Sequence, residues 1–513
     1  MAPRRDRRRL LVLIGTAVAV VVVGLGVQRY LIGDSPSAER EPLPEATVPQ
    51  PPEPLEIEGT QVEPAHPSGF ETPGLLTFRG SPTRSYYGEG PVPEDPQIVW
   101  SYPDAPMCHT SPRDERTWCG TGWTGQPAVF KRDERTWVVF GAYDAQLHFL
   151  DYDTGEQILP SYPMNDIVKG SVSVDPDGYP LVYAGGALAD DELHVVAIDR
   201  PEPEPEQLWS LHADDVSPTM WHDDWDASAL IMDDYLYQGG ENSVFHIVKL
   251  NRSYDDDGLV HVDPELVFHA PGWDQELLDG LTDSARHHEN VSIENSIAYD
   301  DGIAYFANGG GLVQGWDVSA IDEGVEPERV FRFWTGDDTD ATITIDDEGY
   351  LYVAVEWQHQ LPRGMEVGQV LKLDPDQPDD PVVWSFHDPA AGECCGPEHE
   401  AGLWATVGLH EDLIIAPTHG GMIYGLDRMS GEVRWEINRG AQTWSSPVIV
   451  DDVWIQGSCD ETVRAYDVSD TTVQPPELWA VQLEGCVEST PAVWEGRVFV
   501  GARGGHFYAI GDG

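Results

Sequence analysis

A short β-forming pattern recurs eight times along this chain and limits its possible folds more than any other feature. Each copy opens with a small or polar residue, and an Asp- and Gly-rich turn such as Asp175–Gly178 then leads to a second β-forming run. Because Gly supplies the positive φ that tight turns need, each copy is typical of a β-hairpin. The eight copies begin near Gln126, Ser171, Ser228, Ser296, Ala341, Ala405, Ser446 and Thr490.

A third β-forming run follows in each copy, and the Asp or Asn at its end gives the size of the repeat. These residues lie 40 positions apart between Asp427 and Asp467, and 66 apart between Asn251 and Asp317. A four-stranded propeller blade takes roughly 40–45 residues, so the longer intervals contain loop insertions. The terminal residues are Asp151, Asp199, Asn251, Asp317, Asp374, Asp427 and Asp467.

The two ends of the repeated region complement each other. Ile98–Tyr102 resembles a fourth strand without the three before it, whereas Val493–Ile510 supplies three strands without a fourth. Together they complete one blade and close a ring, which removes free sheet edges. An all-β solenoid is the alternative, but it needs no complementary ends. We therefore predict an all-β fold over residues 74–513, an eight-bladed β-propeller of four-stranded blades closed by the N-terminal strand.

The start of the chain has the features of a membrane anchor. Five Arg lie within residues 1–9, and the following Leu10–Val27 carries no charge. A helix of that length just crosses a bilayer core, and its basic flank stays cytoplasmic. We predict a cytoplasmic basic segment (1–9), a transmembrane signal anchor (10–32) and a Pro-rich acidic stalk (33–73), with the propeller on the extracytoplasmic side of the cell membrane. A signal peptide cleaved near Gly24–Gly26 is the alternative.

The charge balance excludes one class of function. Asp and Glu number 90 against 29 Lys and Arg, a net charge of −61; since the first 33 residues hold six Arg and one Asp, the remainder carries −66. Sequence-independent nucleic-acid binding depends on basic residues that neutralise phosphates, so we expect no nucleic-acid partner. Such acidity fits solubility in salty surroundings, general solubility, or capture of divalent cations.

One run carries a family resemblance. Residues 425–435 read GLDRMSGEVRW, with weaker copies at Asp151–Glu156 and Ala465–Asp467. A small residue, Asp, Ser-Gly and Trp in this spacing resemble the tryptophan-docking repeat of eight-bladed quinoprotein propellers. Over about 78–512 the chain is similar to the PQQ-binding-like β-propeller proteins, which include quinoprotein alcohol dehydrogenases and non-catalytic outer-membrane-assembly lipoproteins. The resemblance implies Trp side chains between blades, which lock the ring without a cofactor.

All six Cys fall in loops of one propeller face. That face carries the loops that precede each blade's first strand, here called leading loops, and the loops that join second to third strands. Outside the membrane these Cys should be oxidised, although their spacing leaves the pairing open. We expect Cys108–Cys119, Cys394–Cys395 and Cys459–Cys486. In some quinoprotein alcohol dehydrogenases, a bond between adjacent Cys lies beside the quinone.

Residues at the openings of the first strands should point toward the central channel. The resemblance implies that a PQQ enzyme would need Ca²⁺ held by oxygen ligands, a carboxylate base, a cation at the quinone oxygens and a flat ring beneath it. Each of these residue types also fits plain channel lining, so we assign no catalytic residue and no metal ligand. The candidate cofactor-binding residues are Lys169, Asp226, Glu294, Asn295, Asp340, Trp404, Trp444 and Glu488.

Three smaller groups suggest metals only weakly. His287–Glu289, and His399 between Glu398 and Glu400, lack the spacing of a closed site. Ser253–Gly258 resembles the start of a Ca²⁺ loop, but Pro264 stands where the bidentate Glu belongs, so we predict a hairpin turn.

We predict a membrane-anchored, non-catalytic platform that binds a protein or cell-envelope ligand through its loop-rich face, with no assured cofactor. The alternative function is a PQQ- and Ca²⁺-dependent dehydrogenase of alcohols or sugars. The identity of the ligand does not follow from the sequence, because propeller faces recognise partners by shape rather than by a motif.

Overall fold

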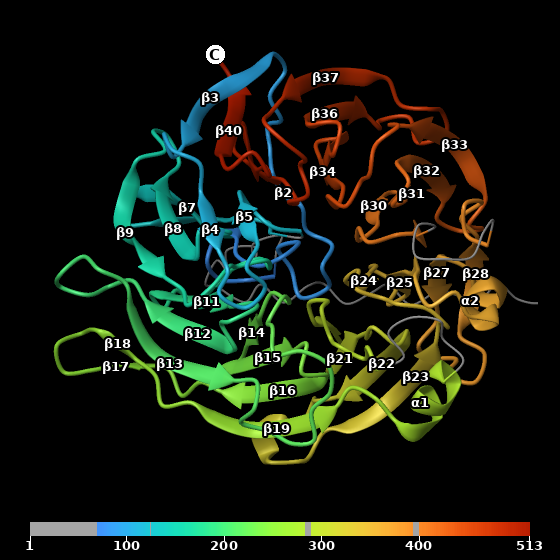
Figure 1. Cartoon of the computed structure of the whole chain (residues 1–513), viewed down its shortest axis with the longest axis horizontal. Helices are drawn as coiled ribbons and strands as arrows, with labels where there is room; N and C mark the ends of the chain where they lie inside the picture. Colours follow the sequence, from blue (N-terminus) through green and yellow to red (C-terminus); the bar gives the residue numbers. More distant parts are fainter. Residues whose placement is uncertain (1–68, 124, 283–288, 393–399) are drawn as a thin grey trace, which may run out of the picture. The chain divides into compact units, whose positions relative to one another are not determined.

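A computed structural model describes residues 69–123, 125–282, 289–392 and 400–513, all within one structural unit, Glu63–Gly513. Eight main β-sheets stand in a ring, as Figure 1 shows, which confirms the predicted eight-bladed propeller. The predicted anchor and the stalk up to residue 68 lie outside the described residues. Within the described ranges, no helix has the length and apolar character needed to span a membrane.

Each blade is an antiparallel sheet whose strands are counted outward from the channel. The first four blades are as follows. Blade 1 contains β6 (Ala128–Arg132), β7 (Arg135–Ala142), β8 (Gln146–Asp151) and β9 (Gln157–Pro163); blade 2, β10 (Ser173–Val174), β11 (Leu181–Gly185), β12 (Glu192–Ala197) and β13 (Glu206–His212); blade 3, β14 (Leu230–Met232), β15 (Tyr235–Gly239), β16 (Val244–Lys249) and β19 (Glu265–Pro271); blade 4, β20 (Ala298–Asp300), β21 (Ile303–Phe306), β22 (Leu312–Asp317) and β23 (Glu328–Trp334).

The other four blades continue around the ring. Blade 5 contains β24 (Thr344–Ile345), β25 (Leu351–Ala354), β27 (Val370–Leu373) and β28 (Val382–Phe386); blade 6, β30 (Gly408–His410), β31 (Leu413–Pro417), β32 (Met422–Asp427) and β33 (Val433–Asn438); blade 7, β34 (Val448–Val450), β35 (Val453–Ser458), β36 (Thr462–Asp467) and β37 (Glu477–Gln482); blade 8, β38 (Ala492–Trp494), β39 (Arg497–Gly501), β40 (Phe507–Asp512) and β3 (Pro96–Tyr102).

Short elements lie in the connections. Three two-stranded ribbons pair β4 (Cys108–Thr110) with β5 (Thr117–Cys119), β17 (Ser253–Tyr254) with β18 (Val260–His261), and β26 (Glu356–Trp357) with β29 (Ala401–Gly402). The β17–β18 hairpin confirms the turn predicted over Ser253–Gly258. The helices are α1 (Gln275–Leu281), α2 (Pro362–Val367) and the 3₁₀ turn η1 (Ile321–Glu323).

The terminal strands close the ring as the sequence predicted. β3 pairs antiparallel with β40, so that Ile98 lies opposite Ile510. Trp100 in β3 donates from its indole Nε1 to the backbone oxygen of Tyr152 in blade 1, at 3.0 Å. Blade 8 is therefore built from both ends of the described chain, and no free sheet edge remains between it and blade 1.

Tryptophan docking joins neighbouring blades where the repeat predicted it. Trp384 of blade 5 donates from Nε1 to the backbone oxygen of Arg428 in blade 6, at 3.0 Å. Gly431 has a positive φ of 73°, and a Cβ there would come within 2.5 Å of the Trp384 ring. The Gly of the repeat therefore makes room for the Trp of the preceding blade, which is why the two occur in fixed spacing.

A belt of hydrogen bonds surrounds the channel at the openings of the first strands. In six of the steps between neighbouring blades, a backbone N–H donates to the hydroxyl of the next blade, for example from Ser296 to Thr342 at 3.0 Å. Gln126 stands at this position in blade 1, and its Nε2 donates to the Pro491 oxygen of blade 8 at 2.7 Å. The belt explains the small polar residue that opens each repeat. Its members are Gln126, Ser171, Ser228, Ser296, Thr342, Thr406, Ser446 and Thr490.

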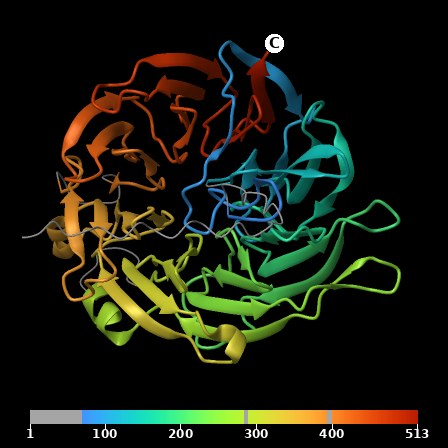
Figure 2. The same cartoon turned by 180° about the vertical axis from the view of Figure 1, so that it is seen from behind.

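A segment that the sequence did not predict fills the other end of the channel. Residues 74–89, here called the channel plug, run through the middle of the ring, where Figures 1 and 2 show them in blue. Strand β1 (Gly74–Leu75) pairs with β6, and β2 (Gly88–Glu89) pairs in parallel with β38. Just ahead of the plug, Phe70 is buried and Thr72 donates its N–H to the Pro176 oxygen at 3.0 Å.

The plug contacts all eight blades along their innermost strands, from the belt residues Gln126 and Ser228 to Ile345 at the end of β24. Because those strands all run in the same direction, the plug extends from the belt toward the channel end opposite the leading loops. Contacts in blades 1 to 8 involve, in that order, Val129, Val174, Ala229, Tyr299, Ile345, Leu409, Pro447 and Val493.

Two fully buried arginines anchor the plug. Arg79 donates to the backbone oxygens of Val407 and Pro447, both at 2.6 Å, and Arg84 donates from Nε to the Ile297 oxygen at 2.8 Å. Among the described residues, no carboxylate pairs with either guanidinium. Burial lowers the pKa of Arg84 to about 9 and also lowers that of Arg79. Backbone dipoles of blades 4, 6 and 7 therefore replace the missing counter-charges.

Replacing Arg79 by Met should destabilise the protein strongly. The change removes hydrogen bonds to blades 6 and 7 and leaves buried carbonyl groups unpaired, so we expect a loss of about 3–5 kcal/mol. Arg135→Met, at an exposed position in β7, is the matched control and should change stability by less than about 0.5 kcal/mol. Urea unfolding of the two variants measures the difference, and equal stabilities would show that the plug is not an integral part of the ring.

Candidate functional site

The channel mouth on the leading-loop face is lined by one residue from each blade, two positions before the belt residue. This channel ring divides into an acidic sector, an aromatic sector and a Glu–Arg sector. The corresponding residue of blade 1, Thr124, lies outside the described residues. The described members are Lys169, Asp226, Glu294, Asp340, Trp404, Trp444 and Glu488. The structure brings Lys169 to Asp226 and places Trp404 near Trp444.

In blade 3, three buried carboxylates surround the ammonium group of Lys169. Its Nζ lies 2.6 Å from Asp224, 3.0 Å from Asp226 and 3.2 Å from Glu241. Burial alone would lower the pKa of Lys169, but the carboxylates raise it well above its usual value. Burial also acts to raise the pKa of Glu241, yet Lys169 outweighs it and holds that pKa at about 2. Lys169 is therefore a permanent cation in this trio.

In blade 5 a second trio, Asp338, Asp340 and Glu356, is fully buried. One ligand oxygen from each residue lies within 4.8 Å of those of the other two. Burial, followed by the neighbouring carboxylates, raises the pKa of Asp338 and Glu356 well above the usual value, and burial raises that of Asp340 to about 6. Glu294 of blade 4 adds to this field, and its own pKa is raised well above normal by burial and by Asp340.

The aromatic sector spans blades 6 and 7. The ring centroids of Trp404 and Trp444 lie 6.4 Å apart, and both side chains are half-buried. His419 lies 4.0 Å from the Trp404 centroid and accepts a 2.9 Å hydrogen bond from the indole Nε1 of Trp444. Burial lowers the pKa of His419, which keeps its ring neutral. The imidazole thus fastens the two indoles to each other.

Blade 8 completes the mouth with an ion pair. Arg503 lies 3.0 Å from Glu488 and donates from Nε to the backbone oxygen of Cys119 at 3.0 Å. Cys119 is joined to Cys108 across the β4–β5 ribbon, and Cys459 of blade 7 is joined to Cys486 before blade 8, both as the sequence predicted. The third predicted bond, Cys394–Cys395, lies outside the described residues, as do His287, His288 and His399.

Asn295 has a different environment from the other candidate residues. Its Nδ2 donates to the backbone oxygens of Ala307 and Thr339, both at 2.9 Å, and its Oδ1 accepts from the N–H of Ala307 at 3.1 Å. The amide is therefore occupied in joining blade 4 to blade 5. The proposed cofactor role of all eight candidates stays a prediction.

Sequence reasoning missed two of the three residues in each acidic trio. Asp224 and Asp338 lie two residues before the predicted ring members Asp226 and Asp340, and Glu241 and Glu356 lie two residues beyond the second strand of the same blade. The missed signal is an Asp-x-Asp pair followed 15 or 16 residues later by Glu. It becomes visible only when blades 3 and 5 are aligned on their belt residues.

The donor set of the mouth suits a cation better than an anionic quinone. Lys169 of the channel ring is committed to three carboxylates, and Arg503 beside the ring is committed to Glu488. His419 contacts both indoles where a flat cofactor ring would need open access. PQQ carries carboxylate groups of its own, which the acidic sector would repel. The described residues therefore do not fit this cofactor, and we derive no step through it.

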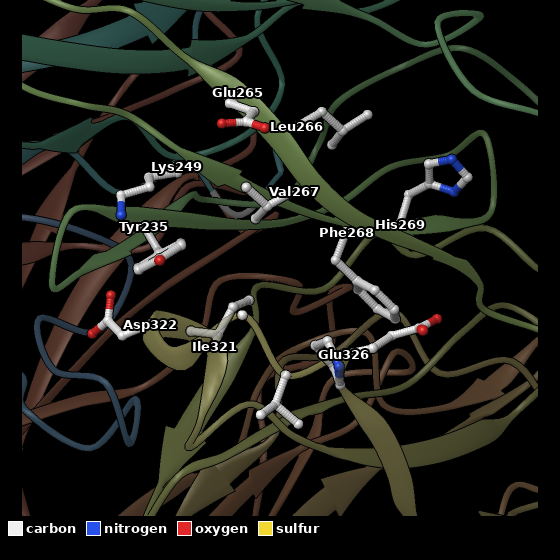
Figure 3. A pocket seen from close by; sticks show the side chains of 13 residues that line it. Tyr235, Lys249, Glu265, Leu266, Val267, Phe268, His269, Ile321, Asp322 and Glu326 are labelled. Atoms are coloured by element: carbon white, nitrogen blue, oxygen red, sulfur yellow. The ribbon is translucent and has the colours of Figure 1, made fainter.

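A separate pocket lies far from the mouth, between blades 3 and 4. Figure 3 shows residues from β16, β19 and the η1 region around it, with Tyr235, Lys249 and Asp322 facing one another. Its lining mixes aliphatic, aromatic and charged side chains, and Lys249 lies 5.4 Å from the Tyr235 ring. No trio of carboxylates or other metal-ligating groups converges there among the described residues. The channel mouth is the stronger candidate site.

Replacing Lys169 by Met should destabilise the protein most at neutral pH. The change leaves the carboxylates of Asp224, Asp226 and Glu241 buried without a cation, at about 3–5 kcal/mol. Their folded-state pKa values then lie above the unfolded values, so they bind protons on folding and stability recovers as the pH falls from 7 to 5. Urea unfolding at both pH values measures this recovery.

Lys131→Met is the control for that experiment. Lys131 forms an exposed pair with Glu495, and its loss should change stability by less than about 1 kcal/mol at either pH. A Lys169→Met penalty that stays the same at pH 5 and pH 7 would contradict the electrostatic role of Lys169.

Comparisons with known proteins agree with this architecture. A family model described as outer membrane protein assembly factor BamB matches residues 367–474, which span parts of blades 5 to 7. No match to a curated protein was found. The matched run contains Gly425–Trp435, on which the sequence resemblance rested.

Solved structures show the same fold at low sequence identity. BamB from Moraxella catarrhalis is 14% identical, with a TM-score of 0.51, and the match covers 82% of this chain and 100% of BamB. Quinohemoprotein alcohol dehydrogenase from Comamonas testosteroni is 12% identical, with a TM-score of 0.53, over 86% of this chain and 80% of the enzyme. Sqt1 from Saccharomyces cerevisiae is 9% identical, with a TM-score of 0.53, over 76% and 96%. The fold and the matched repeat thus support the resemblance to the PQQ-like β-propeller repeat proteins.

Proposed function

We propose that this protein is a non-catalytic docking platform, held at the membrane by residues 10–32 with the propeller on the extracytoplasmic side. Its leading-loop face binds a protein partner or a cell-envelope ligand. The observation that carries the proposal is the bracing of that face, where loops that are usually mobile are fixed by covalent and charged contacts. The similarity to BamB, an assembly factor by its description, supports a protein partner.

Disulfides brace the part of the face over blades 7 and 8. The Cys108–Cys119 ribbon is held over blade 8 by the Met107 N–H, which donates to the Gly505 oxygen at 2.8 Å, and by Arg503. Cys459–Cys486 links loops of two neighbouring blades. Cys459–Cys486 lies beside Glu488 of the channel ring, and Cys119 accepts a hydrogen bond from Arg503, the ion-pair partner of Glu488.

Carboxylates brace the part over blades 4 and 5. Asp274 caps helix α1 through the N–H of Leu277 and also receives Arg329 and Arg332, at 2.8–2.9 Å. Asp337 accepts the backbone N–H groups of Gln358 and His359 at 2.8 and 2.7 Å. A surface with loops fixed in this way binds a partner without first losing much conformational entropy.

The charge of the platform selects its partner. The chain outside the first 33 residues is strongly anionic, and exposed acidic residues on this face include Glu366 in α2 and Glu484 before blade 8. A basic surface or segment on the partner would be steered toward such a field. We therefore propose that the partner presents a basic contact surface.

Charge reversal on the leading-loop face should weaken the binding of a basic probe selectively. An oligolysine peptide is titrated into the full chain at 150 mM salt, where the screening length of about 8 Å suppresses the effect of distant charges. We expect the double change Glu366→Lys and Glu484→Lys to lower affinity at least about tenfold, measured by calorimetry.

The matched control reverses two charges on the opposite face. Glu156 and Asp256 are exposed in connections between third and fourth strands, so Glu156→Lys with Asp256→Lys changes the net charge equally. It should lower the affinity less than about twofold. Equal losses in both double variants would mean that net charge alone, and not a docking face, binds the probe.

The rival function, a PQQ- and Ca²⁺-dependent dehydrogenase, rests on the fold shared with the Comamonas testosteroni enzyme. Addition of PQQ and CaCl₂ to the full chain should give no dye reduction over a panel of alcohols and sugars, because in the described part of the mouth Lys169 and Arg503 are both committed to carboxylates. Turnover that disappears in Glu294→Ala or Asn295→Ala would overturn the platform proposal.

A further inference from the structure

Blades 3 and 5 present the same three carboxylates at equivalent positions. In each blade, an Asp-x-Asp pair precedes the belt residue, and a Glu follows two residues after the second strand, β15 or β25. Both trios are buried, and within each the three ligand oxygens lie within 4.8 Å of one another. The trios are Asp224, Asp226 and Glu241 in blade 3, and Asp338, Asp340 and Glu356 in blade 5.

The blade 3 trio shows what this arrangement binds. It encloses one positive charge, the ammonium group of Lys169, at 2.6–3.2 Å from each of the three carboxylates. Lys169 comes from the neighbouring blade, two residues before the belt residue Ser171. The arrangement is thus a cation site that the protein fills with its own side chain.

The blade 5 trio has no such side chain among the described residues. The corresponding position of the preceding blade is Glu294, an acid in place of a lysine, and the ion pairs of the described residues include no Lys or Arg that reaches Asp338, Asp340 or Glu356. Asp338 Oδ1, Asp340 Oδ1 and Glu356 Oε1 are buried and have no hydrogen-bond partner. Three orphaned carboxylate oxygens in one buried cluster are costly unless a cation joins them.

The remaining oxygens of this trio are held in place by neutral groups. Asn290 donates from Nδ2 to Asp338 Oδ2 at 3.1 Å, and Gln358 donates from Nε2 to Glu356 Oε2 at 3.0 Å. Asp337 accepts backbone N–H groups from the loop after Glu356 and so joins that loop to the start of blade 5. The backbone N–H of Glu356 donates to the backbone oxygen of Asp338 at 2.9 Å. The fold therefore fixes the carboxyl groups of Asp338 and Glu356, and Asp340 lies between them within hydrogen-bonding reach of both.

We propose that Asp338, Asp340 and Glu356 bind a hard divalent cation of the Ca²⁺ type, in the place that the Lys169 ammonium takes in the equivalent trio of blade 3. Oxygen-only ligands favour Ca²⁺ or Mg²⁺ over Zn²⁺ or Cu²⁺, which prefer nitrogen and sulfur. Water completes the coordination sphere. This site needs neither a quinone nor the docking function proposed above, and it joins the loops of the channel mouth.

Calcium titration of the full chain, purified in detergent and freed of metals with EGTA, tests the site. Calorimetry should show one high-affinity site per chain, and saturating Ca²⁺ should raise the midpoint of thermal unfolding by about 3–5 °C. Asp338→Asn and Glu356→Gln keep the side-chain size while they remove a charged ligand. Each should weaken Ca²⁺ binding at least about 100-fold and abolish the thermal shift, because ligand charge sets Ca²⁺ affinity.

Two further measurements separate lost binding from lost folding. In EGTA, both variants should unfold at or above the wild-type temperature, since each replaces a buried carboxyl group, whose ionised form its neighbours repel, by a neutral amide. Asp347→Asn, an exposed position in the hairpin turn at the far end of the same blade, is the matched control and should bind Ca²⁺ as the wild type does. No Ca²⁺ binding by the wild type, or equal binding by Glu356→Gln and Asp347→Asn, would overturn the proposal.

Discussion

The hydrogen bonds of Arg79 and Arg84 to the backbone of the innermost strands are the interaction on which the rest of this structure depends. They hold the channel plug against blades 4, 6 and 7, where no described carboxylate compensates either charge. With one end of the channel filled, the other becomes a blind mouth in which charged side chains are buried. The unusual electrostatics of the acidic sector follow from this closure, since the same carboxylates in an open pore would be hydrated.

The acidic sector shows how a repeated fold can use one position in two ways. In blade 3 the carboxylate trio encloses Lys169, and the result is a fixed internal ion pair cluster. In blade 5 the neighbouring blade supplies Glu294 instead, and the trio keeps three orphaned oxygens, against one, Asp226 Oδ1, in blade 3. The ring residue of the preceding blade, Lys169 in one case and Glu294 in the other, therefore separates a structural site from a candidate ligand site. In blades 6 to 8 the corresponding ring positions hold Trp404, Trp444 and Glu488.

Much of the fold was predictable because its signals are local and repeated. The hairpin turns, the Gly431–Trp384 docking spacing and the complementary ends each fix a neighbour, and the two described disulfides follow from loops that share a face. The plug was not predictable, since residues 74–89 contain no blade pattern and their partners are backbone groups spread over the whole ring. Glu241 and Glu356 were missed for a related reason: a carboxylate among 90 becomes conspicuous only beside its structural equivalent in another blade.

Hydrogen–deuterium exchange of the full chain, with and without Ca²⁺, tests most directly the claim that a closed channel carries a cation-binding mouth. The backbone amides of residues 74–89 should exchange only with global unfolding in both conditions. Those of residues 337–360 should exchange more slowly once Ca²⁺ is present. Exchange of the plug within seconds, or an identical rate at 337–360 in EGTA and in Ca²⁺, would contradict the account.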